Sequence, residues 1–238
     1  MRRLLIVAAV TFLTAYVVVC VVMYTQQRKF LYFPPASKKA PVHRAGAPMV
    51  VYFHGNAMAA GEVDDIAAQL PGGFLAIEYP GYGNEPGSPT EESIYEAAER
   101  QLKGLPRDVV LVGQSLGTGP AVELAKRGWG SKLVLLTPFT SVPDAAQRVM
   151  PWLPARWLVR DRFDSASKAP GITIPVLVVH GDEDEVIPHE LGQQLAPLFP
   201  NGRLMTVPGG HHNDLWDRAE VVEAVRAFIS SPAPAVPP

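Results

Sequence analysis

The first part of the chain is apolar without interruption. Residues 4–24 carry no charge and show no polar face, and a helix of this length would span roughly 30 Å. That length matches the hydrocarbon layer of a bilayer. Two arginines precede the segment, and Arg28 and Lys29 follow it, with aromatic residues close by. The pattern predicts an uncleaved, single-pass transmembrane anchor over residues 1–27.

A cleaved signal peptide is the alternative for this segment. Its apolar region would be only about 7 to 15 residues long and would end at a small-x-small cleavage site. The run here is longer, and Val18, Val19, Cys20 and Val21 offer no such site. Basic residues after the segment outnumber those before it, which favours a domain on the inner side of the membrane. Long domains can nevertheless translocate despite this bias. The side of the membrane therefore stays open.

Beyond the anchor, short apolar runs alternate with amphipathic segments. The runs predict strands at residues 49–53, 74–77, 109–112, 133–136, 176–179 and 204–207. Between them, apolar residues recur at spacings of three and four, which predicts helices at residues 62–70, 90–102, 116–126, 190–198 and 219–229. Several strands are apolar throughout, as in sheets covered on both faces. This order predicts an α/β fold, a mostly parallel sheet with helices on both faces.

The remaining segments set the expected domain boundaries. Residues 28–48 predict a tether, because they become polar and rich in Pro, and the domain itself is expected over residues 49–230. Residues 139–171, approximately, break the rhythm with several prolines and predict a cap insertion at the carboxyl edge of the sheet, where ligands bind. Residues 231–238 are rich in Pro and Ala and predict a disordered tail.

Composition excludes several classes of protein. The chain has 238 residues, of which 47% are hydrophobic and 18% charged, and its net charge is −2. These values suit one sizeable core and exclude a mainly disordered chain. There is no basic excess to hold nucleic acid. Cys20 is the single cysteine, so an internal disulfide framework and a cysteine-based zinc site are both excluded. Nothing in the composition indicates the oligomeric state.

A serine lies in a distinctive sequence after the third predicted strand. Gly113-Gln114-Ser115-Leu116-Gly117 joins that strand to a predicted helix. This arrangement is typical of a nucleophile elbow, a sharp turn that exposes the serine hydroxyl in a left-handed backbone conformation. A phosphate-binding loop or a simple tight turn is the alternative, but the spacings of dinucleotide and nucleotide loops are missing. We predict Ser115 as a catalytic nucleophile.

A serine hydroxyl needs a base and an acid, which in this architecture follow at the ends of later strands. Asp182 and Asp184 follow the strand at residues 176–179, and His211 and His212 follow the next strand. Spacing alone does not choose between the members of each pair. An acidic run is also typical of a solvated loop, and adjacent histidines are also found as a surface pair or a weak metal site.

The loop after the first strand has the sequence His54-Gly55-Asn56. The backbone N–H of Asn56 is a candidate to join that of Leu116 in an oxyanion hole, which would hold the negative oxygen of a tetrahedral intermediate. We expect the His54 side chain to be structural and to pack beneath this loop. A mechanism of this kind requires no metal and no organic cofactor.

Together these segments resemble the α/β-hydrolase family, and within it the membrane-anchored serine hydrolases related to the protein depalmitoylases. The resemblance covers residues 28–229. It rests on RKFLYFP at 28–34, FHGNA at 53–57, YPGYG at 79–83, GQSLGTGPA at 113–121, RDRFDS at 160–165, HG at 180–181 with Asp184, and HND at 212–214. The family's acid ends an H-G-x-x-D motif and its base precedes N-D, so the resemblance implies Asp184 and His212 as the partners of Ser115.

Two departures from the family pattern affect these expectations. Residues 36–50 are too short and too rich in Pro for the antiparallel strand pair that usually precedes the H-G-N strand, so we expect about six strands. Met58 and Ala59 stand where relatives commonly carry Gly-Asn, which leaves the shape of the oxyanion loop less defined.

The resemblance implies an esterase or thioesterase that works through an acyl-enzyme on acyl esters, lipids or acylated proteins. Trp152 and Trp157 of the insertion are candidate substrate-binding residues, because an apolar insertion near a membrane suits an acyl slot. Alternatively, these two side chains cover the core. A peptidase of the same fold and a catalytically idle, membrane-tethered binding module are the alternative functions.

Overall fold

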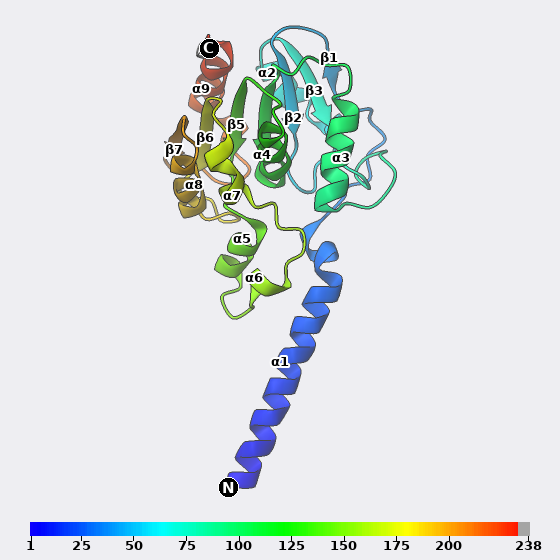
Figure 1. Ribbon diagram of the computed structural model, residues 1–238, viewed down its shortest axis with the longest axis vertical. Helices are drawn as coiled ribbons and strands as arrows, with labels where there is room; N and C mark the ends of the chain where they lie inside the picture. The colour runs from blue at the N-terminus through cyan, green and yellow to red at the C-terminus, as the bar shows by residue number, and fades with distance from the viewer. Residues whose placement is uncertain (233–238) are drawn as a thin grey trace.

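The computed structural model describes residues 1–232 and consists of an α/β domain at one end of a long helix (Figure 1). Most of the tail expected to be disordered, residues 233–238, lies outside the described residues. The long helix, α1 (Arg2–Leu31), is long and apolar enough to cross a membrane, and none of its residues is buried. It continues past Arg28, so the first residues of the expected tether are helical.

A seven-stranded sheet with the order β1-β3-β2-β4-β5-β6-β7 forms the centre of the domain. The strands are β1 (His43–Arg44), β2 (Met49–Phe53), β3 (Gly73–Ile77), β4 (Val110–Gln114), β5 (Lys132–Leu136), β6 (Val176–Gly181) and β7 (Gly202–Val207). All pairs are parallel except β1 with β3. The six predicted strands are therefore present, and the short antiparallel edge strand β1 makes the sheet one strand larger than expected.

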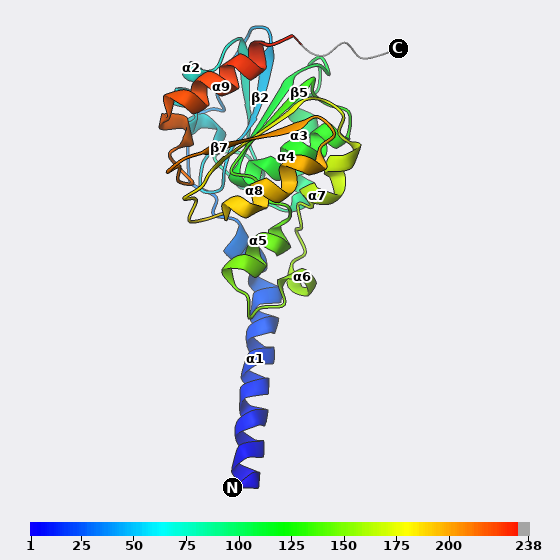
Figure 2. The same cartoon turned by 90° about the vertical axis from the view of Figure 1, so that its left-hand side faces the viewer.

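Helices cover both faces of the sheet, as Figure 2 shows. One face carries α3 (Glu91–Gln101), α4 (Thr118–Lys126) and α8 (His189–Leu195), and the other carries α2 (Asp64–Gln69) and α9 (Ala219–Ser230). Alternate residues of each strand serve the two cores: Val51 and Phe53 face the first layer, and Val50 and Tyr52 face the second. This double burial explains why the central strands contain continuous apolar runs. The expected α/β architecture is confirmed.

The insertion between β5 and β6 folds into short helices at the carboxyl edge of the sheet, beside α1 (Figure 1). These helices are α5 (Val142–Val149), α6 (Ala155–Leu158) and α7 (Ser165–Lys168), followed by the 3-10 helix η3 (Ala169–Gly171). The other 3-10 turns are η1 (Ala60–Glu62), η2 (Ser115–Gly117), η4 (Ala196–Leu198) and η5 (Leu215–Asp217). In the rest of this article, "the insertion" means residues 139–171.

Candidate active site

The turn after β4 presents Ser115 at the carboxyl edge of the sheet. Ser115 has φ +51°, in the left-handed region that non-glycine residues rarely adopt. The turn is also crowded, because a Cβ atom at Gly117 would overlap the carbonyl oxygen of Phe53, and one at Gly113 would overlap that of Gly117. Glycine is therefore required on both sides of the serine, and the strained turn directs the hydroxyl away from the sheet.

The side chains of Ser115, His212 and Asp184 form a continuous hydrogen-bonded chain. Nε2 of His212 lies 2.9 Å from Oγ of Ser115, and Nδ1 lies 2.8 Å from Oδ2 and 3.0 Å from Oδ1 of Asp184. Because a carboxylate can only accept, Nδ1 of the neutral imidazole carries the proton and Nε2 is free to accept the serine proton. This geometry equips the imidazole to act as a general base.

Asp184 is held as a carboxylate by its surroundings. Its burial alone would raise the pKa, but hydrogen bonds from His180, His212 and the backbone N–H of Ile187 outweigh burial and keep the pKa well below its usual range. Oδ1 accepts from the N–H groups of Val186 at 2.9 Å and Ile187 at 2.8 Å. The negative charge is therefore available to stabilise an imidazolium at His212.

The neighbouring candidates point elsewhere. Oδ1 of the exposed Asp182 accepts a hydrogen bond from the N–H of Gly209 at 2.7 Å. His211 has a side chain that is 52% exposed, and its Nδ1 lies 3.3 Å from Glu185 on the surface. The structure thus brings together the pair that the resemblance implies, which spacing alone could not select.

The loop after β2 is tied to the end of α1 through the Asn56 side chain. Its Oδ1 accepts hydrogen bonds from the N–H of Phe33 at 2.9 Å, the N–H of Ala57 at 3.1 Å and the hydroxyl of Tyr82 at 2.6 Å. Its Nδ2 donates to the carbonyl of Leu31 at 2.6 Å. Within residues 1–232, no protein acceptor takes the backbone N–H of Asn56. That N–H is therefore free for a ligand.

Asn56 and Leu116, the two expected oxyanion residues, line the same cavity as Ser115. His54 lies below their loop and is fully buried, with Nε2 3.3 Å from Oε1 of the buried Glu78 and its ring 4.0 Å from that of Tyr79. This is the structural position expected for His54, since its ring has no access to the cavity.

A cavity of about 540 Å³ adjoins Ser115 and is bounded mainly by apolar side chains. Its walls come from the elbow, the loop after β2, the end of α1 and helix α5. The α1 and α5 residues that line it are Phe30, Leu31, Val142, Ala145, Ala146 and Val149. The sequence analysis did not identify these residues, although Phe30 and Leu31 belong to the RKFLYFP block.

Trp152 and Trp157, the candidate substrate-binding residues, do not line this cavity. Trp157 is 87% exposed and Trp152 is 56% exposed, so they do not cover the core either. Among the described residues, neither belongs to the wall next to Ser115, and Trp152 instead borders a hollow against α1.

Comparison with known proteins identifies the family. The model of the alpha/beta hydrolase family matches residues 50–169, half of the chain and all of the elbow. The chain belongs to the α/β-hydrolase family. A model described as serine hydrolase (FSH1) also matches residues 139–213, a range that contains Asp184 and His212.

Several relatives of this α/β-hydrolase match most of its length. An uncharacterized protein of Mycobacterium tuberculosis is 31% identical over 98% of this chain and 96% of its own. Alpha/beta hydrolase domain-containing protein aho-3 of Caenorhabditis elegans is 34% identical over 79% of this chain and 59% of its own. Human alpha/beta hydrolase domain-containing protein 17B is 32% identical over 76% of this chain and 66% of its own. The resemblance inferred from the sequence is thereby confirmed.

Solved structures confirm the fold of this α/β-hydrolase. An esterase from Exiguobacterium antarcticum superposes with a TM-score of 0.65 at 18% identity, covering 80% of this chain and 94% of the esterase. A monoacylglycerol lipase from Paleococcus ferrophilus gives a TM-score of 0.60 at 18% identity, covering 79% of this chain and 96% of the lipase. At such identities the likeness concerns the arrangement of the backbone.

Proposed function

We propose that this α/β-hydrolase is a membrane-anchored serine hydrolase that cleaves carboxylic ester or thioester bonds. The observation that carries the proposal is the chain of hydrogen bonds from Ser115 through His212 to the buried Asp184. A serine on a strained elbow, aligned with an imidazole whose other nitrogen faces a carboxylate, is the arrangement that activates a hydroxyl for acyl transfer.

The proposed reaction has two halves. His212 takes the proton of Ser115 while Oγ attacks the acyl carbon, and the protonated imidazole then gives that proton to the departing alcohol or thiol. Water attacks the resulting acyl-enzyme in the same way, which releases the carboxylic acid and restores the serine. The N–H groups of Asn56 and Leu116 would hold the oxyanion in both halves, and one such donor typically contributes about 2.7 to 4 kcal/mol.

The proposed anchor is α1. Support for it comes from the uncharged segment at residues 4–24, the basic residues at both ends and the absence of buried residues in this helix. A soluble protein rarely exposes so large an apolar surface.

The proposal is tested with full-length protein in detergent micelles, using a fluorophosphonate probe and p-nitrophenyl butyrate. Wild-type protein should be labelled and should hydrolyse the ester, and Ser115→Ala should lose both properties. Ser88→Ala, at an exposed serine distant from the cavity, is the matched control and should behave as wild type.

Three outcomes would contradict the proposal. If Ser115→Ala were labelled as strongly as wild type, or kept more than a few per cent of the wild-type activity, Ser115 would not be the nucleophile. A folded wild-type protein without any labelling would instead be an idle binding module. Faster cleavage of a matched amide than of the ester would identify a peptidase.

A further inference from the structure

The end of α1 is fixed to the insertion rather than free of it. Nε2 of Gln27 donates to the carbonyl of Leu158 at 3.1 Å, and its Oε1 accepts from the N–H of Arg160 at 2.7 Å. At the next residue, the guanidinium of Arg28 makes two hydrogen bonds to the buried carboxylate of Asp161, at 2.9 and 3.2 Å. These contacts set the spacing between the helix and the insertion.

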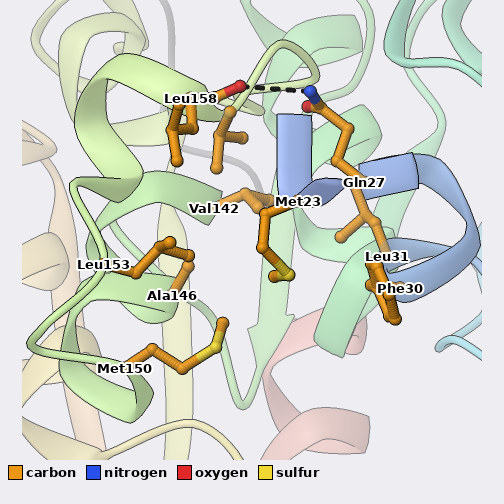
Figure 3. A pocket seen from close by; sticks show the side chains of 10 residues that line it. Met23, Gln27, Phe30, Leu31, Val142, Ala146, Met150, Leu153 and Leu158 are labelled. Atoms are coloured by element: carbon orange, nitrogen blue, oxygen red, sulfur yellow. Dashed lines mark hydrogen bonds between the residues drawn. The ribbon is translucent and has the colours of Figure 1, made fainter. Parts of the chain in front are cut away.

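An apolar cleft of about 110 Å³ lies between these two parts. In Figure 3, Met23 reaches into the space from α1, and Met150 and Leu153 border it from the insertion. The polar side chain in its wall is Gln27, whose amide already makes the hydrogen bonds given above. The surface that this cleft offers to a ligand is therefore hydrocarbon and thioether, without a free polar group from Gln27.

The cleft lies next to the cavity beside the nucleophile. The two spaces share part of their walls, on both α1 and α5. The shared residues are Phe30, Leu31, Val142, Ala146 and Met150. The cleft at the side of α1 is therefore separated from the cavity beside Ser115 only by apolar side chains that line both spaces.

The insertion also extends along the apolar part of α1. The hydroxyl of Tyr16 donates to the carbonyl of Trp152 at 3.0 Å, and the Trp152 side chain lies in a hollow formed with Phe12 and Val19. At 1.5 Å per residue, Tyr16 lies about 12 Å along the helix from Tyr24, the end of the uncharged segment. In a bilayer spanned by α1, the tip of the insertion at Trp152 would lie at the depth of the acyl chains, and the cleft would begin at Met23, near the end of the uncharged segment.

We propose that the cleft between α1 and the insertion binds the acyl chain of the substrate, and that this chain enters sideways from the bilayer. The inference rests on the proposed function and deepens it, because α1 becomes one wall of the substrate site as well as the anchor. A linear hydrocarbon chain suits a narrow apolar space that begins at the border of the acyl-chain layer and adjoins the cavity of the nucleophile. The exposed Trp152 and Trp157 are then lipid contacts of the insertion rather than substrate contacts.

The first test compares acyl chain lengths. Full-length protein in lipid nanodiscs is assayed with p-nitrophenyl palmitate and p-nitrophenyl butyrate, and the ratio of kcat/KM for the long ester to that for the short ester is measured. Ala146→Trp, which places an indole where the cleft meets the cavity, should lower this ratio at least about tenfold. Ala227→Trp, on the exposed side of α9, is the matched control and should leave the ratio unchanged.

A second variant changes polarity instead of volume. Leu158→Asp places a carboxylate in the outer part of the cleft and should also lower the ratio about tenfold, whereas Leu198→Asp on the surface of η4 should not. Fluorophosphonate labelling of each variant shows whether the fold and nucleophile survive. Variants that are labelled but keep the wild-type ratio would overturn the proposal that the cleft binds the acyl chain, and they would leave the hydrolase proposal intact. A wild-type protein that is neither labelled nor active would overturn both proposals.

The entry from the bilayer is tested separately by fluorescence quenching. Nanodiscs that contain phosphatidylcholine brominated on its acyl chains should quench the wild-type tryptophan emission more strongly than that of a Trp152→Phe, Trp157→Phe double variant. The remaining indoles, Trp129 and Trp216, are buried in the domain and report the background. Equal fractional quenching of both proteins would overturn the sideways entry.

Discussion

Nε2 of His180 lies 3.2 Å from Oδ2 of Asp184, the same oxygen that Nδ1 of His212 approaches to 2.8 Å. This nitrogen also lies 2.9 Å from the carbonyl oxygen of Ile187. Because both neighbours are acceptors, Nε2 of His180 carries a proton and donates. A second, fully buried imidazole therefore holds the acid together with the base. We regard His180 as a positioning residue that acts through Asp184.

Replacing His180 by Phe should lower kcat for p-nitrophenyl butyrate by about tenfold and change KM less than twofold. The reason is that a hydrogen bond to a charged group contributes about 1.5 to 3 kcal/mol, and about 1.4 kcal/mol corresponds to a tenfold change in rate. His180→Gln, which retains a donor, should recover most of the rate. Identical losses in both variants, measured by steady-state kinetics, would point to packing instead.

The two aspartates after β6 should differ sharply in their importance. Asp184→Asn should lower kcat by about 10⁴, because an amide at this position disturbs the tautomer of His212 and cannot stabilise its cation. Asp182→Asn should stay within about threefold of wild type, since Asp182 bonds the backbone of Gly209 on the surface. Initial rates with p-nitrophenyl butyrate measure both, and the reverse ranking would assign the acid to Asp182.

The lowered pKa of Asp184 also predicts a pH dependence of stability. A carboxyl group whose pKa is depressed in the folded state stabilises that state above the unfolded pKa, about 3.9, and loses this contribution as the pH falls toward the folded pKa. The difference in unfolding free energy between wild type and Asp184→Asn should therefore shrink from pH 7 to pH 3. Urea denaturation at the two pH values measures it, with the exposed Asp65→Asn as control. A constant difference would contradict the pKa assignment.

Gly117→Ala should destabilise the domain by about 3 kcal/mol, because the added methyl group overlaps the Phe53 carbonyl of the neighbouring strand. Gly104→Ala provides a matched control. Gly104 has φ +93° but open space around it, so alanine there carries only the backbone cost of about 1 to 2 kcal/mol. Thermal unfolding followed by circular dichroism compares the two, and equal shifts would show that crowding at the elbow is unimportant.

The sequence predicted the elements that are long and buried. Each strand from β2 to β7 has an apolar run, since both of its sides face a core, and the elbow is readable because glycine is sterically required around Ser115. Strand β1 was missed because two edge residues leave no periodic pattern. The choice of His212 over His211 depended on the resemblance. The two histidines are adjacent, and the sequence spacing does not indicate which one faces the cavity and which one faces the solvent.

The substrate cavity was the least predictable part of the site. Phe30 and Leu31 follow an apolar helix, and residues that face lipid, a ligand or a protein core share the same composition. Their place in the wall depends on how α1 meets the insertion, through Gln27 and Arg28. The exposed positions of Trp152 and Trp157 could not be predicted for the same reason, since their apolar character does not indicate which side of the insertion they occupy.

The helix α1 is unbroken from residue 2 to Leu31, and this limits how far the catalytic domain can move relative to the membrane. A catalytic domain on a flexible linker can take many positions around its attachment point, whereas a continuous helix and the ion pair between Arg28 and Asp161 restrict the height and tilt of the domain. Ser115 would then stay at a fixed height above the lipid surface. Encounters would depend on lateral diffusion of both molecules, so that local surface density, rather than bulk concentration, governs turnover.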